Sequence, residues 1–249
     1  MHIVAIIPAR YGSRRLPAKP LVEIAGKPMI QHVYERASLA SLVDTVLVAT
    51  DDERIASAVR TFGGNPVMTP ASLQTGTDRT AFVARTIPEA DIVLNVQGDE
   101  PLIESQMIDE AIQPMLENSE ITAGTLVKRI QREEELINPN VVKVVLDTNG
   151  YCLYFSRSII PFGQALRRDA WLTHLMYYKH IGLYVFRREF LLQYAAMNPT
   201  PLEQSENLEQ LRILEHGFRI KGTVTSYDSS PVDTEEDLNA VRALVGDKQ

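Results

Sequence analysis

The fold is decided near the amino terminus by residues 3–20, which read Ile3-Val4-Ala5-Ile6-Ile7-Pro8-Ala9-Arg10-Tyr11-Gly12-Ser13-Arg14-Arg15-Leu16-Pro17-Ala18-Lys19-Pro20. The apolar run at the start predicts a buried strand. The three prolines exclude a continuous helix after it, and Gly12 leaves the backbone free to curl. Four cations follow the strand, with no acid before Glu23. Because open α/β sheets bind ligands at the carboxyl ends of their strands, we interpret this basic loop as a polyphosphate site.

Familiar phosphate-binding motifs do not account for the loop. A P-loop needs G-x-x-x-x-G-K-[ST], whereas Gly26-Lys27 is followed by Pro28 and has no suitable glycine at position 21. A G-x-G-x-x-G dinucleotide motif is also missing. Most charge runs are simply solvated faces, but the buried strand and the three prolines favour a binding loop over that alternative.

The composition indicates an ordinary globular protein. The 249 residues are 45% hydrophobic and 23% charged, which suits one large α/β domain or a domain with a small appendage. A net charge of −7 argues against a nucleic-acid or anionic-membrane surface. The single cysteine, Cys152, is expected in the core and fits a reducing cytoplasm. No signal-peptide pattern and no membrane-spanning apolar run is present.

Strand and helix signals alternate through the first half of the chain. This alternation predicts right-handed βαβ crossovers and an α/β fold with a mostly parallel, Rossmann-like sheet flanked by helices. Further strands are expected at 45–50, 66–69, 92–96 and 121–128, and helices at 28–38, 53–62, 80–87 and 105–117. The polar stretch Thr75-Gly76-Thr77-Asp78-Arg79 is expected to be a loop.

The second half departs from this rhythm. Strands at 141–146 and 151–156 flank Asn149-Gly150, a strong hairpin signal. The bulky, irregular segment 162–178 is either core filler or a dimerisation arm, and its aromatic side chains favour the arm. A strand is expected at 180–186, helices at 188–197 and 207–216, and a strand at 218–227. A last helix should begin after Thr234, which can cap it together with Asp237.

Carboxylates at strand ends are the candidate metal ligands. Asp99 follows the expected strand at 92–96, and Mg²⁺ prefers such oxygen ligands, shared with substrate phosphates. Glu100 is either a second ligand or a surface acid. Asp233 lies between the last strand and the last helix, where a helix-start role is the simpler reading of one acid alone. Two such carboxylates facing one basic loop favour a metal-bridged phosphate site.

Several other polar residues are ambiguous from the sequence. Arg157 follows the hairpin, and its fork of donors suits a carboxylate, although an isolated arginine is usually a surface residue. His180, Tyr184 and Gln97 are structural polar groups unless they line the same cleft. His32 is interpreted as structural, and no Ser-His-Asp or Cys-His nucleophile set is present.

The opening motif resembles that of the sugar-acid cytidylyltransferases. Ile7-Pro8-Ala9-Arg10 with Gly12-Ser13, Arg15-Leu16-Pro17 and Lys19-Pro20-Leu21 carry the resemblance, which alone marks nucleotidyltransferases in general. Seven further segments narrow it to the enzymes that activate 3-deoxy-manno-octulosonate (KDO). They are Thr75-Gly76-Thr77-Asp78-Arg79, Asn95-Val96-Gln97-Gly98-Asp99-Glu100-Pro101, Asn138-Pro139-Asn140-Val141-Val142-Lys143, Tyr154-Phe155-Ser156-Arg157-Ser158, His180-Ile181-Gly182-Leu183-Tyr184, Leu208-Glu209-Gln210-Leu211-Arg212 and Val232-Asp233-Thr234. Thr75 stands where this family is expected to have serine, and it keeps the hydroxyl.

The resemblance implies a CTP- and Mg²⁺-dependent transfer that gives CMP-KDO and pyrophosphate for lipopolysaccharide assembly. It implies a single nucleotidyltransferase domain over residues 1–249, with a sugar-binding and dimerisation subregion at about 140–190, in a cytoplasmic homodimer. By the same resemblance, the nucleotide is held by Ala9, Arg10, Ser13, Arg15, Lys19, Thr75, Gly76, Arg79 and Gly98. The sugar acid is surrounded by Gln97, Arg157, His180, Tyr184, Glu209 and Gln210. Asp99 and Asp233 hold the metal, and Arg10, Arg15, Lys19 and Asp99 are the catalytic set.

Other functions remain open at this point. A metal-dependent glycosyltransferase also places an acidic motif after a strand, but would not need cations for a departing pyrophosphate. A sugar-nucleotide-binding regulator built on an inactive enzyme would be favoured by loss of Lys19, Asp99 or Asp233, and all three are present. A cytidylyltransferase for a related acid, such as 8-amino-KDO or a sialic-type acid, differs by few contacts.

Overall fold

The computed structural model describes residues 1–12 and 16–246, and its chain forms two compact units. Unit 1 consists of Met1–Asp109, Leu183–Ala195 and Asp228–Gln249, and unit 2 of Glu110–Gly182 and Ala196–Tyr227. The single nucleotidyltransferase domain therefore stays a prediction, and each unit is described by itself.

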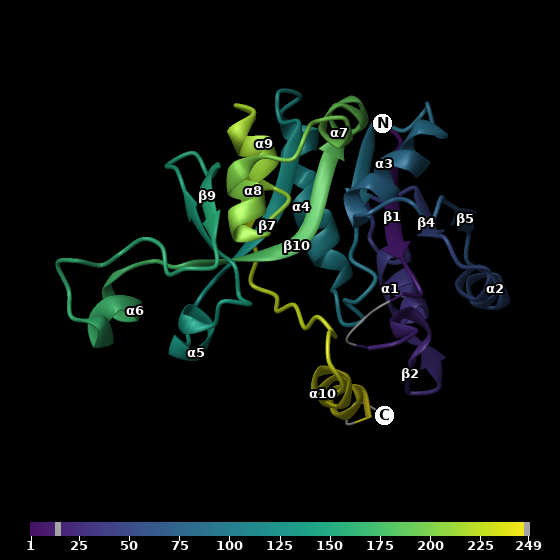
Figure 1. Cartoon of the computed structure of the whole chain (residues 1–249), viewed down its shortest axis with the longest axis horizontal. Coiled ribbons are helices and arrows are strands. Elements are labelled where there is room, and N and C mark those ends of the chain that lie inside the picture. The colour runs from purple at the N-terminus through teal and green to yellow at the C-terminus, as the bar shows by residue number, and fades with distance from the viewer. Residues whose placement is uncertain (13–15, 247–249) are drawn as a thin grey trace. The chain divides into compact units, whose positions relative to one another are not determined.

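Unit 1 is built on a mainly parallel sheet. Its strands are β1 (Ile3–Ala9), β4 (Thr45–Thr50), β5 (Pro66–Met68) and β6 (Ile92–Asn95). β1 pairs in parallel with β4 on one side and with β6 on the other, and β4 pairs in parallel with β5. The last residues of β10 (Tyr178–Arg187) add an antiparallel partner to β6. Figure 1 shows β1, β4 and β5 side by side.

The direction of winding reverses at β1. The chain moves outward from β1 through β4 to β5 and then returns to place β6 on the opposite side of β1. In open α/β sheets ligands bind at such a reversal, outside the carboxyl ends of the strands. The expected mostly parallel α/β sheet is confirmed, and it puts the segments after β1 and β6 next to each other.

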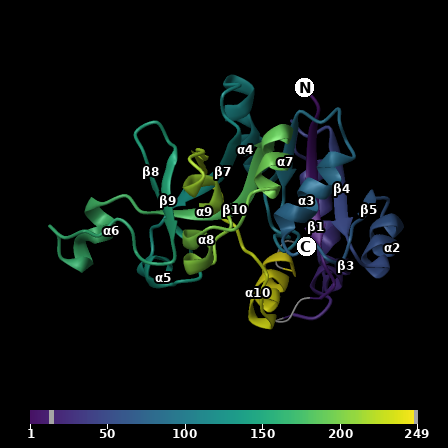
Figure 2. The same ribbon diagram turned by 45° about the horizontal axis from the view of Figure 1, so that its top comes forward.

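The helices of unit 1 bury the apolar faces that the periodicity predicts. In α1 (Met29–Ser38) the four buried residues are Met29, Ile30, Val33 and Ala37. α2 (Glu53–Thr61) contacts β4 and β5, while α3 (Gly76–Arg85) contacts β1 and α7 (Arg188–Ala195). α4 (Ser105–Glu117) begins in unit 1, and α10 (Glu235–Gly246) ends the chain. Figure 2 shows α3 and α7 next to each other.

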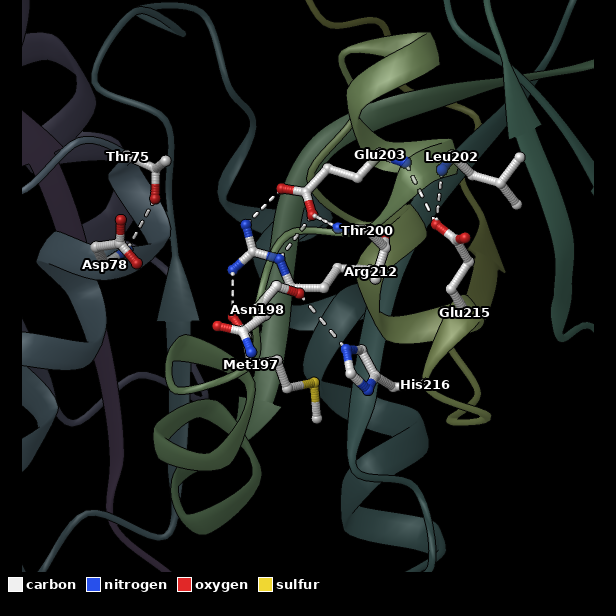
Figure 3. Close-up of polar contacts among 10 residues, drawn as sticks. All are labelled: Thr75, Asp78, Met197, Asn198, Thr200, Leu202, Glu203, Arg212, Glu215 and His216. Atoms are coloured by element: carbon white, nitrogen blue, oxygen red, sulfur yellow. Dashed lines mark hydrogen bonds and ion pairs between the residues drawn. The ribbon is translucent and has the colours of Figure 1, made fainter.

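The start of α3 corrects one expectation. The stretch Thr75–Arg79 is not a loop, because α3 begins at Gly76, four residues before the predicted start. The Thr75 hydroxyl accepts a hydrogen bond from the Asp78 main-chain nitrogen at 3.0 Å, as Figure 3 shows. This N-cap satisfies one of the free amides of the first turn. The polar stretch therefore forms the N-cap and first turn of α3.

A small apolar cluster ties α10 to the amino-terminal segment. The 3-10 helix η1 (Lys19–Leu21) and the hairpin of β2 (Glu23–Ile24) and β3 (Lys27–Pro28) follow the basic loop. Ile24 of β2 packs together with the nearby Leu16 and Met29 against the carboxyl-terminal segment. The residues of that segment in the cluster are Val232, Leu238 and Val241. Burial of each such aliphatic side chain contributes about 1.5–3 kcal/mol to the stability of the fold. Because this packing joins the two ends of the chain, it brings Lys19 and Asp233 into one region.

Unit 2 carries the hairpin that Asn149-Gly150 predicts. β8 (Lys143–Leu146) and β9 (Cys152–Ser156) pair antiparallel, and Gly150 takes a positive φ of 77° in the turn. β7 (Ala123–Arg129) pairs in parallel with β11 (Lys221–Val224). The first residues of β10 pair antiparallel with β8. The short helix α5 is Glu133–Ile137.

The helix expected at 207–216 is wrong in its first half. The chain instead forms α8 (Pro201–Glu206) and α9 (Leu211–Glu215). Asn207 ends α8 with a left-handed φ of 52°, a conformation that asparagine tolerates better than most residues. The turn at 207–210 therefore separates two short helices.

The segment 162–178 serves the core and the surface at once. Around η2 (Arg168–Ala170) and α6 (Trp171–His174), Trp171 and Tyr177 pack with Ile130 and Leu136 in a buried cluster. Phe162 and Met176, by contrast, are 74% and 63% exposed. Figure 2 shows α6 at the end of this long excursion, away from β8 and β9. No helix in the described part of the chain is long and apolar enough to cross a membrane.

Candidate active site

The basic loop leaves β1 at the reversal of the sheet. Ala9 is buried as the last residue of the strand, and Arg10 is exposed directly after it. Tyr11 lies under the guanidinium of Arg54, whose Cζ is 3.4 Å from the ring centroid. The predicted ligands Ser13 and Arg15, like Arg14, lie outside the described residues.

Lys19 joins the two predicted metal ligands. Its Nζ donates to Asp99 Oδ2 at 2.6 Å and to Asp233 Oδ1 at 2.9 Å. The lysine side chain is 13% exposed, against 26% for Asp99 and 37% for Asp233. These residues are 80 and 214 positions from Lys19 along the chain. The structure therefore brings one cation and two carboxylates of the predicted site into direct contact.

Local structure explains how each of the three residues is held. Ala18, before Lys19, has a left-handed φ of 53°, a costly conformation for alanine that turns the chain into η1. The Val232 nitrogen donates to the Asp99 main-chain oxygen at 2.9 Å. Asp237 Oδ2 accepts from the nitrogens of Asp233 and Thr234 at the start of α10. The Asp237 nitrogen donates to the Thr234 hydroxyl at 3.2 Å, so the predicted cap of the last helix is confirmed. Together these bonds fix the backbone of Asp233.

Gly98 allows the segments after β1 and β6 to approach each other. A Cβ atom at position 98 would lie 2.8 Å from the Pro8 main-chain oxygen, closer than such atoms pack. At Gly76, the start of α3, a Cβ atom would lie 3.3 Å from Pro8 Cγ. Two predicted nucleotide-binding glycines thus line the same turn of chain, where side chains would push the backbone away.

Arg79 is buried and engaged within unit 1. Its Nη2 donates to Asp51 Oδ2 at 3.2 Å, and its Nη1 makes a short hydrogen bond to the Thr69 hydroxyl. Asp51 Oδ1 is buried and has no hydrogen-bond partner among the described residues. Asp51 and Thr69 were missed in the sequence. They follow β4 and β5 as Asp99 follows β6, so the strand-end rule applied to every strand would have found them.

Glu100 is not a surface acid. Its side chain is 6% exposed, and Oε1 accepts a hydrogen bond from the Ser229 hydroxyl at 2.6 Å. Burial, with a smaller contribution from the neighbouring Asp99 carboxylate, raises the pKa of Glu100 to about 7 against the lowering effect of the Ser229 hydrogen bond.

Gln97 and Tyr184 are both neighbours of Asn95. Gln97 Nε2 donates to Asn95 Oδ1 at 3.2 Å, and Tyr184 of β10 stands opposite the buried Asn95 in the antiparallel register. The Tyr184 ring stacks on Phe186 with centroids 5.9 Å apart. These two predicted sugar-acid residues share one place in unit 1.

In unit 2, His180 is held as a neutral imidazole. Its Nε2 lies 3.0 Å from the Thr125 hydroxyl, which donates its own hydrogen to the Ile181 main-chain oxygen at 3.1 Å. The hydroxyl therefore accepts from His180 Nε2–H, which leaves Nδ1 as the acceptor of the ring. Burial lowers the pKa of His180 to about 3.

Arg157 holds the end of α8. Its Nε donates to the Glu206 main-chain oxygen at 2.8 Å, and its Nη1 and Nη2 donate to the carbonyls of Pro139 and Asn207. The Glu206 carboxylate accepts from the Ser156 hydroxyl and the Arg157 nitrogen. These contacts account for three of the five N–H donors of the guanidinium, which leaves donors for a ligand carboxylate.

Glu209 and Gln210 lie in the turn between α8 and α9. Gln210 is buried, and its Nε2 has no hydrogen-bond partner within the described part of the chain. A buried amide without a partner is costly, so it is a good candidate for a ligand contact. Next to this turn, Arg212 pairs with Glu203 through two buried hydrogen bonds, shown in Figure 3, and fastens α9 to α8.

The donor set in unit 1 fits a magnesium ion. Asp99 and Asp233 present oxygen ligands that converge on one cation, and Mg²⁺ is usually bound by one or two carboxylates, with water and substrate phosphates as its other ligands. Among the described residues no group of three or more His, Cys, Asp or Glu side chains could hold a metal by itself.

Comparison with known proteins identifies the family. A family model described as cytidylyltransferase matches residues 4–220. The 3-deoxy-manno-octulosonate cytidylyltransferase of Geobacter metallireducens is 58% identical over 246 residues, covering 97% of this chain and 96% of that protein. The chain belongs to this family of sugar-acid cytidylyltransferases. The corresponding enzyme of Geotalea uraniireducens is 56% identical over 246 residues, covering 97% of this chain and 98% of that protein.

Solved structures agree with the family assignment. A CMP:2-keto-3-deoxy-manno-octonic acid synthetase complexed with CTP is 43% identical, covers all of both chains and has a TM-score of 0.93. A 4-diphosphocytidyl-2C-methyl-D-erythritol synthase from Anaerococcus prevotii, at 14% identity and a TM-score of 0.65, shares the fold alone. The resemblance of the cytidylyltransferase motifs and the nucleotidyltransferase fold are therefore confirmed.

Proposed function

We propose that this protein transfers CMP from CTP to the anomeric hydroxyl of KDO, giving CMP-KDO and pyrophosphate for lipopolysaccharide assembly. The observation that carries the proposal is the convergence of Lys19, Asp99 and Asp233 where β1 and β6 end. Membership of the KDO cytidylyltransferase family supports the substrates.

The reaction needs charge control more than a nucleophile from the protein. The hydroxyl oxygen of the sugar acid bonds to the α-phosphorus of CTP, the bond to the β-phosphate oxygen breaks, and the hydroxyl proton is lost to solvent. Both reactants are anions, and negative charge grows on the departing pyrophosphate. Cations of the loop after β1, Arg10 and Lys19 among the described residues, stabilise that charge.

Asp99 and Asp233 would hold Mg²⁺. When bound, the ion supplies charge neutralisation at the phosphates and lowers the pKa of a coordinated hydroxyl. Gly98 keeps the segment that carries Asp99 close to Pro8, and without a metal the Lys19 ammonium contacts both carboxylates. For the sugar acid, Arg157 offers guanidinium donors in unit 2, an orientation role.

The proposal extends to assembly and location. We infer a homodimer formed through the segment 162–178, because Phe162 and Met176 expose large apolar surface next to the cluster of Trp171 and Tyr177. Phe162→Glu should then lower the mass measured by light scattering, and an unchanged mass would refute this interface.

The single buried Cys152 fits a cytoplasmic enzyme, which cell fractionation tests.

Pyrophosphate release tests the function directly. Each of the four nucleoside triphosphates is offered with KDO, 8-amino-KDO and a sialic acid, and CTP with KDO should be preferred. Preference for another acid would favour the alternative function, a cytidylyltransferase for a related sugar acid.

Asp99→Asn and Asp233→Asn should each lower turnover by about 10² or more, while Glu236→Gln at an exposed position of α10 leaves turnover unchanged.

A further inference from the structure

Glu100 is a buried acid to which the proposed reaction gives no part. Its Oε1 accepts from the Ser229 hydroxyl at 2.6 Å, and the Ser230 main-chain nitrogen also donates to its carboxylate. Its Oε2 is buried with no hydrogen-bond partner in residues 1–12 and 16–246. Burying a carboxyl group with one oxygen unpaired costs free energy. A role for Glu100 that offsets this cost is therefore expected.

The Glu100–Ser229 contact joins the two segments that carry the metal ligands. Glu100 is adjacent to Asp99, and Ser229 lies four residues before Asp233. Residues 228–233 have no regular secondary structure, so helix or sheet bonds do not fix their path. The Val232 nitrogen bonds to the Asp99 main-chain oxygen, and Asp237 caps Asp233 from the other side. The contacts of Ser229 and Ser230 with Glu100 therefore hold the amino-terminal part of this segment near Asp99.

We propose that Glu100 and Ser229 are positioning residues that hold Asp233 beside Asp99 and so preassemble the metal site. The proposal rests on the proposed role of these aspartates as magnesium ligands. Two carboxylates repel each other, and an irregular segment can relieve the repulsion by moving away. A hydrogen bond from the half-buried Ser229 to the buried Glu100 opposes that movement, and a ligand held in place loses less conformational entropy when the metal binds.

Direct metal binding tests the proposal without turnover. Mn²⁺ serves as the probe, and its binding is followed by electron paramagnetic resonance with CTP present and no sugar acid. Ser229→Ala should raise the dissociation constant of Mn²⁺ about tenfold, the usual effect of losing a partner that orients a ligand. Ser229→Thr keeps the hydroxyl and should restore binding. Ser230→Ala is the matched control, because Ser230 contacts Glu100 through its main chain.

A second variant and a cycle separate positioning from folding. Glu100→Met removes the acceptor at similar volume. The Ser229→Ala/Glu100→Met double variant should bind Mn²⁺ no more weakly than the Glu100→Met variant, because Glu100→Met already removes the contact that Ser229→Ala breaks. Additive losses, or Ser229→Ala within twofold of the unchanged protein, would overturn the proposal. Asp99→Asn must itself lose Mn²⁺ affinity, and if it does not, the metal assignment fails and this proposal with it.

Discussion

Replacing Lys19 by methionine tests the charge arrangement of the site, because it keeps the apolar stem and removes the ammonium. Lys19 Nζ contacts Asp99 at 2.6 Å and Asp233 at 2.9 Å, and the three side chains are 13–37% exposed. Exposed ion pairs contribute about 0–1 kcal/mol, and breaking a buried pair costs about 3–5 kcal/mol. A partly buried pair lies between them, so we expect a loss of about 2 kcal/mol in the free energy of unfolding without metal.

Thermal unfolding with and without Mg²⁺ is the assay. A loss of about 2 kcal/mol lowers Tm by roughly 4–8 °C in a protein of this size. Mg²⁺ should then raise Tm more in the variant than in the unchanged protein, because the ammonium and the metal compete for the same carboxylates. Lys27→Met is the control, since Lys27 pairs with Glu35 at 2.7 Å but both side chains are 44–46% exposed. Equal Tm changes in the two variants, or an unchanged response to Mg²⁺, would refute the reasoning.

Three further outcomes follow from contacts of the site. Arg157→Lys should raise KM for KDO tenfold or more and leave KM for CTP within about twofold, because an ammonium lacks the two-pronged fork; equal rises would mean that Arg157 merely holds the end of α8. Gly98→Ala should lower Tm by several degrees through overpacking against the Pro8 carbonyl, whereas Gly12→Ala, with open space around it, should not; equal Tm values would refute this close approach. His180 has a folded pKa of about 3, so the unfolded chain binds the extra proton below pH 6.5, and stability falls by up to about 1.4 kcal/mol per pH unit as the pH drops. His180→Asn should flatten that acid limb of Tm against pH, and an equally steep limb would refute the assignment.

The sheet of unit 1 was predictable because each of its strands is a short apolar run between turn signals. β4 was predicted to the residue, and α1 buries the four side chains that its periodicity selects. The start of α3 was not predicted, because Thr75 and Gly76 are typical of turns as well as of helix caps. The same ambiguity hid the break at Asn207, where a left-handed residue interrupts an otherwise helical pattern.

The sequence was enough to predict which residues form the candidate site, but not which of them contact one another. A strand-end rule selects Lys19 and Asp99 because their strands are neighbours in the sheet. Nothing local says that Asp233, 214 residues from Lys19, returns to the same place. Long-range packing of Leu16, Ile24 and Met29 with the carboxyl-terminal segment decides it. The environment of Glu100 was unpredictable for the same reason, because its hydrogen-bond partner Ser229 lies 129 residues away in the sequence.

The charge balance of the site also explains why one loop carries several cations. Without ligands, Lys19 neutralises one of the two carboxylates that it touches, and the site keeps one net negative charge that attracts a divalent ion. An ion held by both carboxylates would take the place of the Lys19 ammonium there, and that ammonium would then be available to the phosphates that accompany the metal. A single lysine cannot balance a triphosphate, so further cations such as Arg10 are needed beside it. The basic loop and the acidic pair therefore form one system, in which the metal and the nucleotide are expected to bind together more tightly than either binds alone.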